Sequence, residues 1–187
     1  LCLLRLALCK LSSLQSLVLT DDILGSAGLA ELAPALYRNT FIEKLDISYN
    51  ELGVSRNDLN DMESPEILLD ILRRNKTMTT LVLSGNECGQ TTGMVECIAD
   101  GLAGNSTLLK LDLSDCTLGD GGVSTLAQTL GSRNTTLQKL SLDDNYITFM
   151  GVGVLVETNE QNSYYITDLD LSCNQIRNEG AILLARS

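Results

Sequence analysis

The chain has 187 residues and a formal net charge of −11 at pH 7, from 13 basic and 24 acidic side chains. Nucleic acids and anionic membranes bind basic surfaces, so this charge argues against both as partners. Histidine and tryptophan are absent, so the chain lacks the commonest metal ligand and general base, and the strongest aromatic anchor of tight interfaces. The length fits one domain with a core large enough to fold.

One phrase recurs six times along the chain. It has an apolar residue at its first and sixth positions, leucine at its fourth and usually asparagine at its ninth. The copies begin at Leu14, Ile42, Met78, Leu108, Leu137 and Ile166. Successive copies therefore start 28, 36, 30, 29 and 29 residues apart. A period of about 28–29 residues with this phrase is typical of a leucine-rich repeat solenoid.

Each copy predicts a short strand followed by a helix. The leucines at positions four and six suit one face of a strand, and we expect strands near residues 16–19, 44–47, 80–83, 110–113, 139–142 and 168–171. Apolar residues then recur at a spacing of four, as in Leu32 and Leu36, which places them on one helix face. No unit alone can bury both apolar rows, so the units must stack. The sequence predicts an α/β fold: a curved solenoid with a concave parallel sheet, convex helices and about six repeats of about 28–29 residues.

The repeats occupy most of the chain. Residues 1–13 are expected to form the last helix of a preceding repeat, and the repeats lie near 14–41, 42–77, 78–107, 108–136, 137–165 and 166–187. The second repeat is longer by about eight residues, which we assign to a polar insertion loop at 54–65 because neither apolar row can accommodate it. Pro65 is expected to begin the next helix, with Ser64 as its N-cap. The sixth repeat stops within a helix, so we expect a piece of a longer protein.

The ninth position of the phrase has a mechanical role. An asparagine amide there can bond to backbone groups of its own turn and of the neighbouring repeat, which the stack buries. Asp22 and Cys116 interrupt this asparagine column. An aspartate cannot donate, and a thiol forms only weak hydrogen bonds.

The six cysteines are placed as free thiols rather than as a disulfide framework. Cys88 and Cys116, for example, stand at core positions of the repeat, where a thiol packs as a small apolar residue. No CxxC pair indicates a metal site. Reduced thiols favour the cytoplasm, with the nucleus as an alternative. Three N-x-T sequons point instead to secretion, which we disfavour because asparagine also ends the helix of each repeat there: Asn75, Asn105 and Asn134.

Three strings carry a specific resemblance, and they begin at residues 42, 108 and 137: IEKLDISYNELG, LLKLDLSDCTLGDGG and LQKLSLDDNYI. With the period and the helix in every repeat, they resemble the ribonuclease-inhibitor-type leucine-rich repeat family over residues 14–187. This family includes ribonuclease inhibitor, the Ran GTPase-activating protein, tropomodulin and the sensor domains of nucleotide-binding immune receptors. The resemblance implies the fold, and because the matching residues are structural it leaves the member open.

Positions three, five, seven and eight of the phrase flank the buried leucines, and their side chains define what we term the concave face. Eight of these 24 residues are acidic and three are basic. Aspartate at position five belongs to the common family phrase LDLS, so a structural role in the repeat is enough to explain Asp46, Asp112 and Asp170. The phrase does not prescribe the other candidates for partner binding: Tyr49, Asp115, Asp143, Asp144 and Asp168. All eight residues are candidates for contact with a protein partner that has a basic surface.

The sequence predicts no catalytic site. Catalysis needs convergent groups with tuned pKa values in a cleft, and the chain has no histidine, no serine in an elbow context and no phosphate-binding loop. We therefore expect no cofactor, metal or small-molecule substrate. The sequence favours a non-catalytic protein–protein interaction platform, a sensor or scaffold domain within a larger intracellular protein. The resemblance supplies the alternative, a regulator of a small GTPase or of actin assembly, and the 54–65 loop is a second candidate binding surface.

Overall fold

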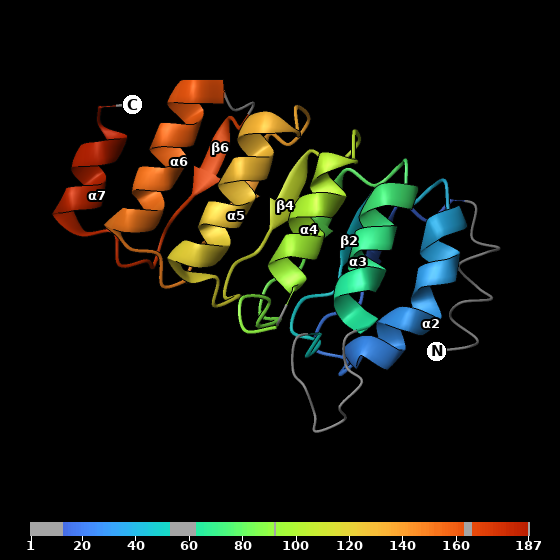
Figure 1. Ribbon diagram of the computed structural model, residues 1–187. Coiled ribbons are helices and arrows are strands. Elements are labelled where there is room, and N and C mark those ends of the chain that lie inside the picture. Colours follow the sequence, from blue (N-terminus) through green and yellow to red (C-terminus); the bar gives the residue numbers. More distant parts are fainter. Residues whose placement is uncertain (1–12, 53–62, 92, 163–165, 187) are drawn as a thin grey trace.

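The computed structural model describes residues 13–52, 63–91, 93–162 and 166–186. The preceding helix expected near residues 1–13, with Cys2 and Cys9, falls almost wholly outside these ranges. Within them six strands alternate with six helices, labelled as in Figure 1. In chain order they are β1 (Ser16–Val18), α2 (Gly25–Arg38), β2 (Lys44–Asp46), α3 (Glu63–Arg74), β3 (Thr80–Val82), α4 (Met94–Ala103), β4 (Lys110–Asp112), α5 (Gly119–Ser132), β5 (Lys139–Ser141), α6 (Phe149–Asn162), β6 (Asp168–Asp170) and α7 (Arg177–Leu184).

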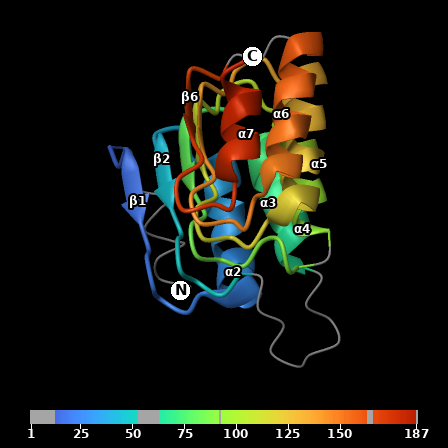
Figure 2. The same ribbon diagram turned by 90° about the vertical axis from the view of Figure 1, so that its left-hand side faces the viewer.

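The six strands form one parallel sheet in the order β1-β2-β3-β4-β5-β6. Its register aligns the fourth-position leucines: Leu17, Leu45, Leu81, Leu111, Leu140 and Leu169. Figures 1 and 2 show the helices as one layer on one side of the sheet, which leaves the other side open. The predicted α/β solenoid is confirmed. Each strand ends one residue before its predicted limit, yet the sixth position keeps a sheet bond, as from the Leu19 N–H to the Asp46 carbonyl at 2.8 Å.

Two apolar rows form the core between the sheet and the helices. The strand row includes Leu45 and Leu81, the helix row includes Leu32 and Leu126, and all four are buried. Each such leucine stabilises the fold by about 1.5–3 kcal/mol, and its burial depends on the repeats on either side. The last strand has a neighbour on one side only, and Leu169 is 39% exposed.

The asparagine column joins each repeat to the one before it. Asn145 is fully buried. Its Nδ2 donates to the Leu113 carbonyl at 2.7 Å, and its Oδ1 accepts from the N–H groups of Cys116 and Leu118, each at 3.1 Å. Asn174 donates to the preceding repeat in the same way, at 2.8 Å. The predicted role of the column is confirmed.

Cys116 fills the column with a thiol in repeat four. Its Sγ donates one long bond to the Leu83 carbonyl, at 3.4 Å. A hydrogen bond to Cys116, together with burial, raises the pKa of the neighbouring Cys88 thiol well above its usual value. The pair packs as a buried filler of the repeat core. The described cysteines are free: Cys88, Cys97, Cys116 and Cys173.

A second asparagine closes the helix of each of the first four repeats: Asn39, Asn75, Asn105 and Asn134. Asn75 Nδ2 donates to the Leu36 carbonyl at 2.9 Å, and its Oδ1 accepts from the Met78 N–H at 2.7 Å. Asn105 and Asn134 repeat both bonds. These are the three sequon asparagines, and all of them are buried. Since a glycan is attached at exposed asparagines, the sequons are explained by the structural use of asparagine in the repeat.

The long second repeat departs from the sequence prediction where its helix begins. α3 begins at Glu63, so residues 63–65 of the predicted 54–65 insertion are helical, and residues 54–62 lie outside the described part. Ser64 is buried in the first turn, and its Oγ has no hydrogen-bond partner within the described ranges. The assignment of Ser64 as N-cap is therefore wrong. Proline lacks an N–H, but the first-turn N–H groups have no partner within a helix, so α3 can begin before Pro65.

Replacing Asn145 with alanine tests the column. Asn145→Ala should lower the free energy of unfolding by about 2–4 kcal/mol, because the bonded groups of Leu113, Cys116 and Leu118 would lose their partners while buried. Urea denaturation followed by circular dichroism measures the change. The reciprocal variant Cys116→Asn restores the column and should raise the free energy of unfolding by about 1 kcal/mol. Equal stability of wild type and Asn145→Ala would show that the column is dispensable.

Candidate functional site

Residues at one position of the phrase form a column across the sheet, because the strands pair in register. The third position contributes Lys110, Lys139 and Asp168 on β4, β5 and β6, and the fifth contributes Asp112, Ser141 and Asp170. Adjacent parallel strands lie about 4.8 Å apart, so neighbours within a column can contact one another. Three repeats therefore build one continuous surface.

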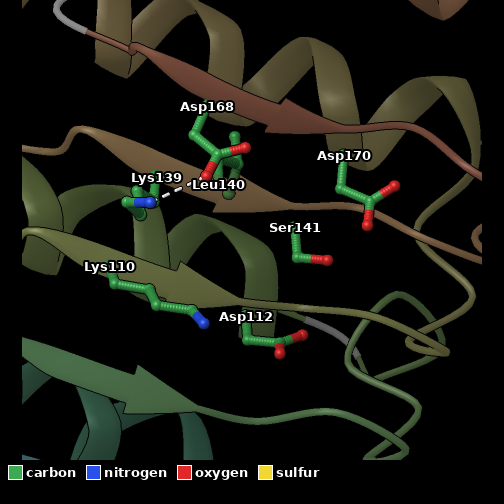
Figure 3. A pocket seen from close by; sticks show the side chains of 7 residues that line it. All are labelled: Lys110, Asp112, Lys139, Leu140, Ser141, Asp168 and Asp170. Atoms are coloured by element: carbon green, nitrogen blue, oxygen red, sulfur yellow. Dashed lines mark hydrogen bonds and ion pairs between the residues drawn. The ribbon is translucent and has the colours of Figure 1, made fainter.

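These two columns, with Leu140, line a hollow of about 270 Å³ on the concave face. Figure 3 shows the carboxylates of Asp112 and Asp170 on either side of Ser141. Lys139 Nζ lies 2.9 Å from Asp168 Oδ2, so these two charges offset each other at the edge of the hollow. Both side chains are exposed, and such a pair contributes at most about 1 kcal/mol to stability. A partner can therefore open this pair at little cost.

The fifth-position aspartates have a structural role. Asp112 Oδ1 accepts hydrogen bonds from the N–H and the hydroxyl of Ser114, at 3.1 and 2.7 Å. Asp170 Oδ1 accepts the same two bonds from Ser172, at 2.9 and 2.6 Å, and they hold the pKa of Asp170 below its usual value because they stabilise the carboxylate. Asp46 bonds to the serine two residues later in the same way. These hydrogen bonds account for the presence of aspartate at the fifth position, so no binding partner is needed to explain it.

In repeat five, the aspartate of the fifth position and the serine of the seventh position have changed places. Position five is Ser141 and position seven is Asp143, where the repeats on either side have aspartate and then serine. The short side chain of Ser141, whose Oγ lies 2.8 Å from Ser114 Oγ, leaves space between the flanking aspartates. Asp143 is half-buried, and its Oδ1 has no hydrogen-bond partner within the described ranges. The hollow is therefore a consequence of the exchange.

The eighth position is left-handed in every repeat. The backbone angle φ lies between 51 and 69° at Asp21, Tyr49, Gly85, Asp115, Asp144 and Cys173. Aspartate tolerates this region better than most residues, because its short polar side chain can bond locally. Asp115 and Asp144 therefore have a backbone reason for their identity. Of the four aspartates that the phrase does not prescribe, the other two, Asp143 and Asp168, are not left-handed, so the backbone does not explain why they are aspartate.

Tyr49 lies in the other half of the concave face. It is 48% exposed, and its ring contacts the backbone of Gly85 in the next repeat. The charges of its own strand are paired, with Lys44 Nζ 3.5 Å from Asp46 Oδ2. Repeats four to six hold two lysines and six aspartates at the face positions, a net charge of −4. The structure thus separates Tyr49 and Asp46 from the other acidic candidates, which gather over β4 to β6: Asp112, Asp115, Asp143, Asp144, Asp168 and Asp170.

Three polar residues of the hollow were missed as site residues from the sequence: Lys110, Lys139 and Ser141. The signal that could find them is their position in the phrase, because they share the third and fifth columns with Asp112, Asp168 and Asp170. The face is consequently mixed in charge, with lysines set among the aspartates.

Comparison with known proteins agrees with this architecture. A family model described as Leucine Rich repeat matches residues 38–61, 104–127 and 163–185. The three matched segments are leucine-rich repeats. One solved structure similar to this leucine-rich repeat chain is the tropomodulin C-terminal domain of Caenorhabditis elegans, with a TM-score of 0.56 and 13% identity over 86% of this chain and 90% of that one. Another is leiomodin-1 actin-binding site 2, with a TM-score of 0.56 and 20% identity over 64% of this chain and 69% of that one. At these identities the likeness concerns the fold.

Membrane-spanning helices and clusters of metal-ligating side chains are absent from the described ranges. None of their helices is both long enough and apolar enough to cross a membrane. Nor does any group of three or more cysteine, aspartate or glutamate side chains in these ranges have the arrangement of a metal site.

Cys173 reports the electrostatic field of the acidic repeats. Its pKa is raised by a hydrogen bond to Asp143 and by the charge of that carboxylate, with smaller contributions from Asp144 and Asp170. A raised pKa leaves less thiolate at a given pH, and the thiolate is the reactive form. Asp143→Asn should therefore speed alkylation of Cys173 several-fold at about pH 8, measured by iodoacetamide labelling and mass spectrometry. Asp21→Asn, at the eighth position of repeat one, is the matched control and should have no effect. Identical rates for wild type and Asp143→Asn would contradict the contact.

Proposed function

We propose that this chain is a non-catalytic protein-interaction domain and that the concave face is its binding surface. The observation that carries the proposal is the hollow over β4 to β6. Three repeats build it, and Lys110, Asp168 and Asp170 present exposed charges there. The helices cover the opposite side of the sheet, so a partner can reach these charges directly (Figure 2). Loops and open faces held by a rigid scaffold are common sites of recognition.

A catalytic role has less support. The hollow of about 270 Å³ lies below the range of about 300–1,000 Å³ that is usual for small-molecule sites. Its lining is mostly polar, whereas such sites are mostly apolar. The Asp112 and Asp170 carboxylates are held by the serines that follow them, and the sequence offers no histidine as a general base.

The charge of the face indicates the chemistry of the partner. A net charge of −4 over repeats four to six favours a protein with a basic surface, because the field steers such a partner toward the face. The positive charges of Lys110 and Lys139 weaken the negative potential locally. The basic groups of the partner must therefore contact the face at positions away from these two lysines. Nucleic acid and anionic membrane have no support, since the chain as a whole carries −11.

We place the domain in a larger intracellular protein, as a sensor or scaffold in the cytoplasm. The free thiols of the four described cysteines support a reducing compartment, since one of them, Cys173, is exposed. The burial of Asn75, Asn105 and Asn134 removes the main argument for secretion.

Actin is the favoured second candidate. The two solved structures described above are of leiomodin-1 and tropomodulin, and the first is named as an actin-binding site. Regulation of actin assembly through the same concave face is therefore the specific alternative to a general platform.

Site-specific photo-crosslinking tests the binding surface. A photo-crosslinking amino acid at Lys110 should give a protein adduct in cells that express the chain, whereas the same amino acid at Gln128, exposed on α5, should not. The adduct yield should fall several-fold in the four-aspartate variant, because its face has lost the charges that steer a basic partner. This variant changes four residues to asparagine, which tolerates left-handed backbone: Asp115, Asp143, Asp144 and Asp168.

Adducts from Gln128 alone, or a yield that the four-aspartate variant leaves unchanged, would place the binding surface elsewhere. Repeating the crosslinking in a lysate of these cells with excess purified actin separates the two candidates. An actin adduct at Lys110 supports regulation of actin. An adduct with another protein, in the presence of excess actin, supports the platform.

A further inference from the structure

Tyr49 and Gly85 occupy the same left-handed position in adjacent repeats, with φ of 54° and 69°. A Cβ atom on Gly85 would lie 2.2 Å from two ring carbons of Tyr49, so the ring lies directly against the glycine backbone. Any larger residue at position 85 would displace it. Tyr49 is nevertheless 48% exposed. The ring is therefore seated on repeat three while much of its surface remains open to solvent.

This pairing is an exception among the repeats. The eighth position otherwise holds aspartate or cysteine, and a bulky aromatic residue is uncommon in left-handed backbone because its side chain crowds the chain. The ring is not part of the buried core, so the core gives no reason for it. The left-handed backbone recurs at this position in every repeat, so it does not account for the ring. An exposed aromatic side chain seated against a glycine of the next repeat instead fits an anchor for a protein partner.

The half of the concave face that holds Tyr49 is nearly neutral, with Asp21 as its one charged residue beside those of β2, and it includes two valines. At the fifth position, Val18 is 53% exposed and Val82 is half-buried, on the strands either side of β2. The charged side chains of β2 are Lys44 and Asp46, and they pair with each other at 3.5 Å. This half of the concave face therefore suits an apolar contact, while the half over β4 to β6 suits a basic one.

We propose that Tyr49 is the aromatic anchor of a two-part protein-binding face and that Gly85 positions its ring. The proposal rests on the proposed function, because it takes the concave face as the binding surface. The partner is a protein segment with an apolar side chain over Tyr49 and a basic cluster over the acidic repeats. Parallel strands lie about 4.8 Å apart, so β5 and β6 are about 14 and 19 Å from β2, and the two parts of the partner are separated by a similar distance.

The two parts have different kinetic roles. Tyrosine is enriched among the residues whose loss weakens interfaces most, and a ring that is already seated loses little freedom when a partner covers it. Exposed charges act mainly on the association rate and on its dependence on salt. Tyr49 therefore sets the dissociation rate, whereas exposed acidic residues such as Asp144 and Asp168 set the association rate.

Random peptides displayed on phage and selected on the full chain provide the probe. Tyr49→Asn should raise the dissociation rate of the selected synthetic peptides by at least about tenfold, since the anchor is lost. The four-aspartate variant should lower their association rate instead, and biolayer interferometry measures both rates. Tyr146→Asn is the matched control, because Tyr146 is 58% exposed and left-handed, with φ of 58°, but lies at the tenth position, outside the concave face. It should leave both rates within about twofold of wild type.

Gly85→Ala tests the seat of the ring and should also raise the dissociation rate. Gly119→Ala controls for backbone strain, because Gly119 has φ of 58° and open space where a Cβ would lie. In the Tyr49→Asn background, Gly85→Ala should have no further effect on binding, because no ring remains to be displaced. Thermal unfolding of each variant verifies that the fold is kept.

Two outcomes overturn the proposal, and they can be told apart. Peptides that leave Tyr49→Asn no faster than wild type, but bind the four-aspartate variant weakly, overturn the anchor and leave the concave face as the binding surface. Peptides that neither variant affects overturn the anchor and the proposed binding surface together.

Discussion

The hydrogen bonds from each ninth-position asparagine to the preceding repeat are the constraint on which the structure depends. Strands of three residues hold their register weakly, and a slip of one residue would turn the buried leucines to the open side of the sheet. Asn145 opposes such a slip, because its amide bonds to Leu113 and to the backbone beside Cys116 in the repeat before. Asn75 fixes the helix end of its repeat in the same manner, through Leu36. Between these two points the apolar rows can stack only in register.

A fixed register turns positions of the repeat into columns, and the concave face is a set of such columns. Asp112 and Asp170 are explained by the serines they bond, and aspartates in the left-handed column by their backbone. Structural chemistry therefore makes much of the face acidic before any partner is considered. The exceptions to the columns are more informative about function. The short side chain of Ser141 leaves space for the hollow. Tyr49 places an aromatic ring against Gly85, at a position where most other repeats have a small polar residue.

The strands, the parallel sheet and the role of the asparagines could be predicted from the sequence, because each recurs six times or nearly so and depends on local spacing. The start of α3 could not, since Ser64 fits a local capping pattern that packing overrides. The hollow and the seat of Tyr49 depend on residues in different repeats. Gly85 lies 36 residues after Tyr49, and nothing in the local sequence of either residue shows that they touch. Such contacts follow only once the register between repeats is known.

The central claim is that register places the side chains of one repeat against the backbone of the next, and the proton NMR spectrum of Gly85 tests it most directly. The Gly85 α-protons should resonate upfield of the usual range for glycine, because the Tyr49 ring lies against them and shields them. This displacement should vanish in Tyr49→Asn and persist in Tyr146→Asn. Gly85 α-protons at ordinary positions in the wild-type protein, unchanged by Tyr49→Asn, would contradict the account.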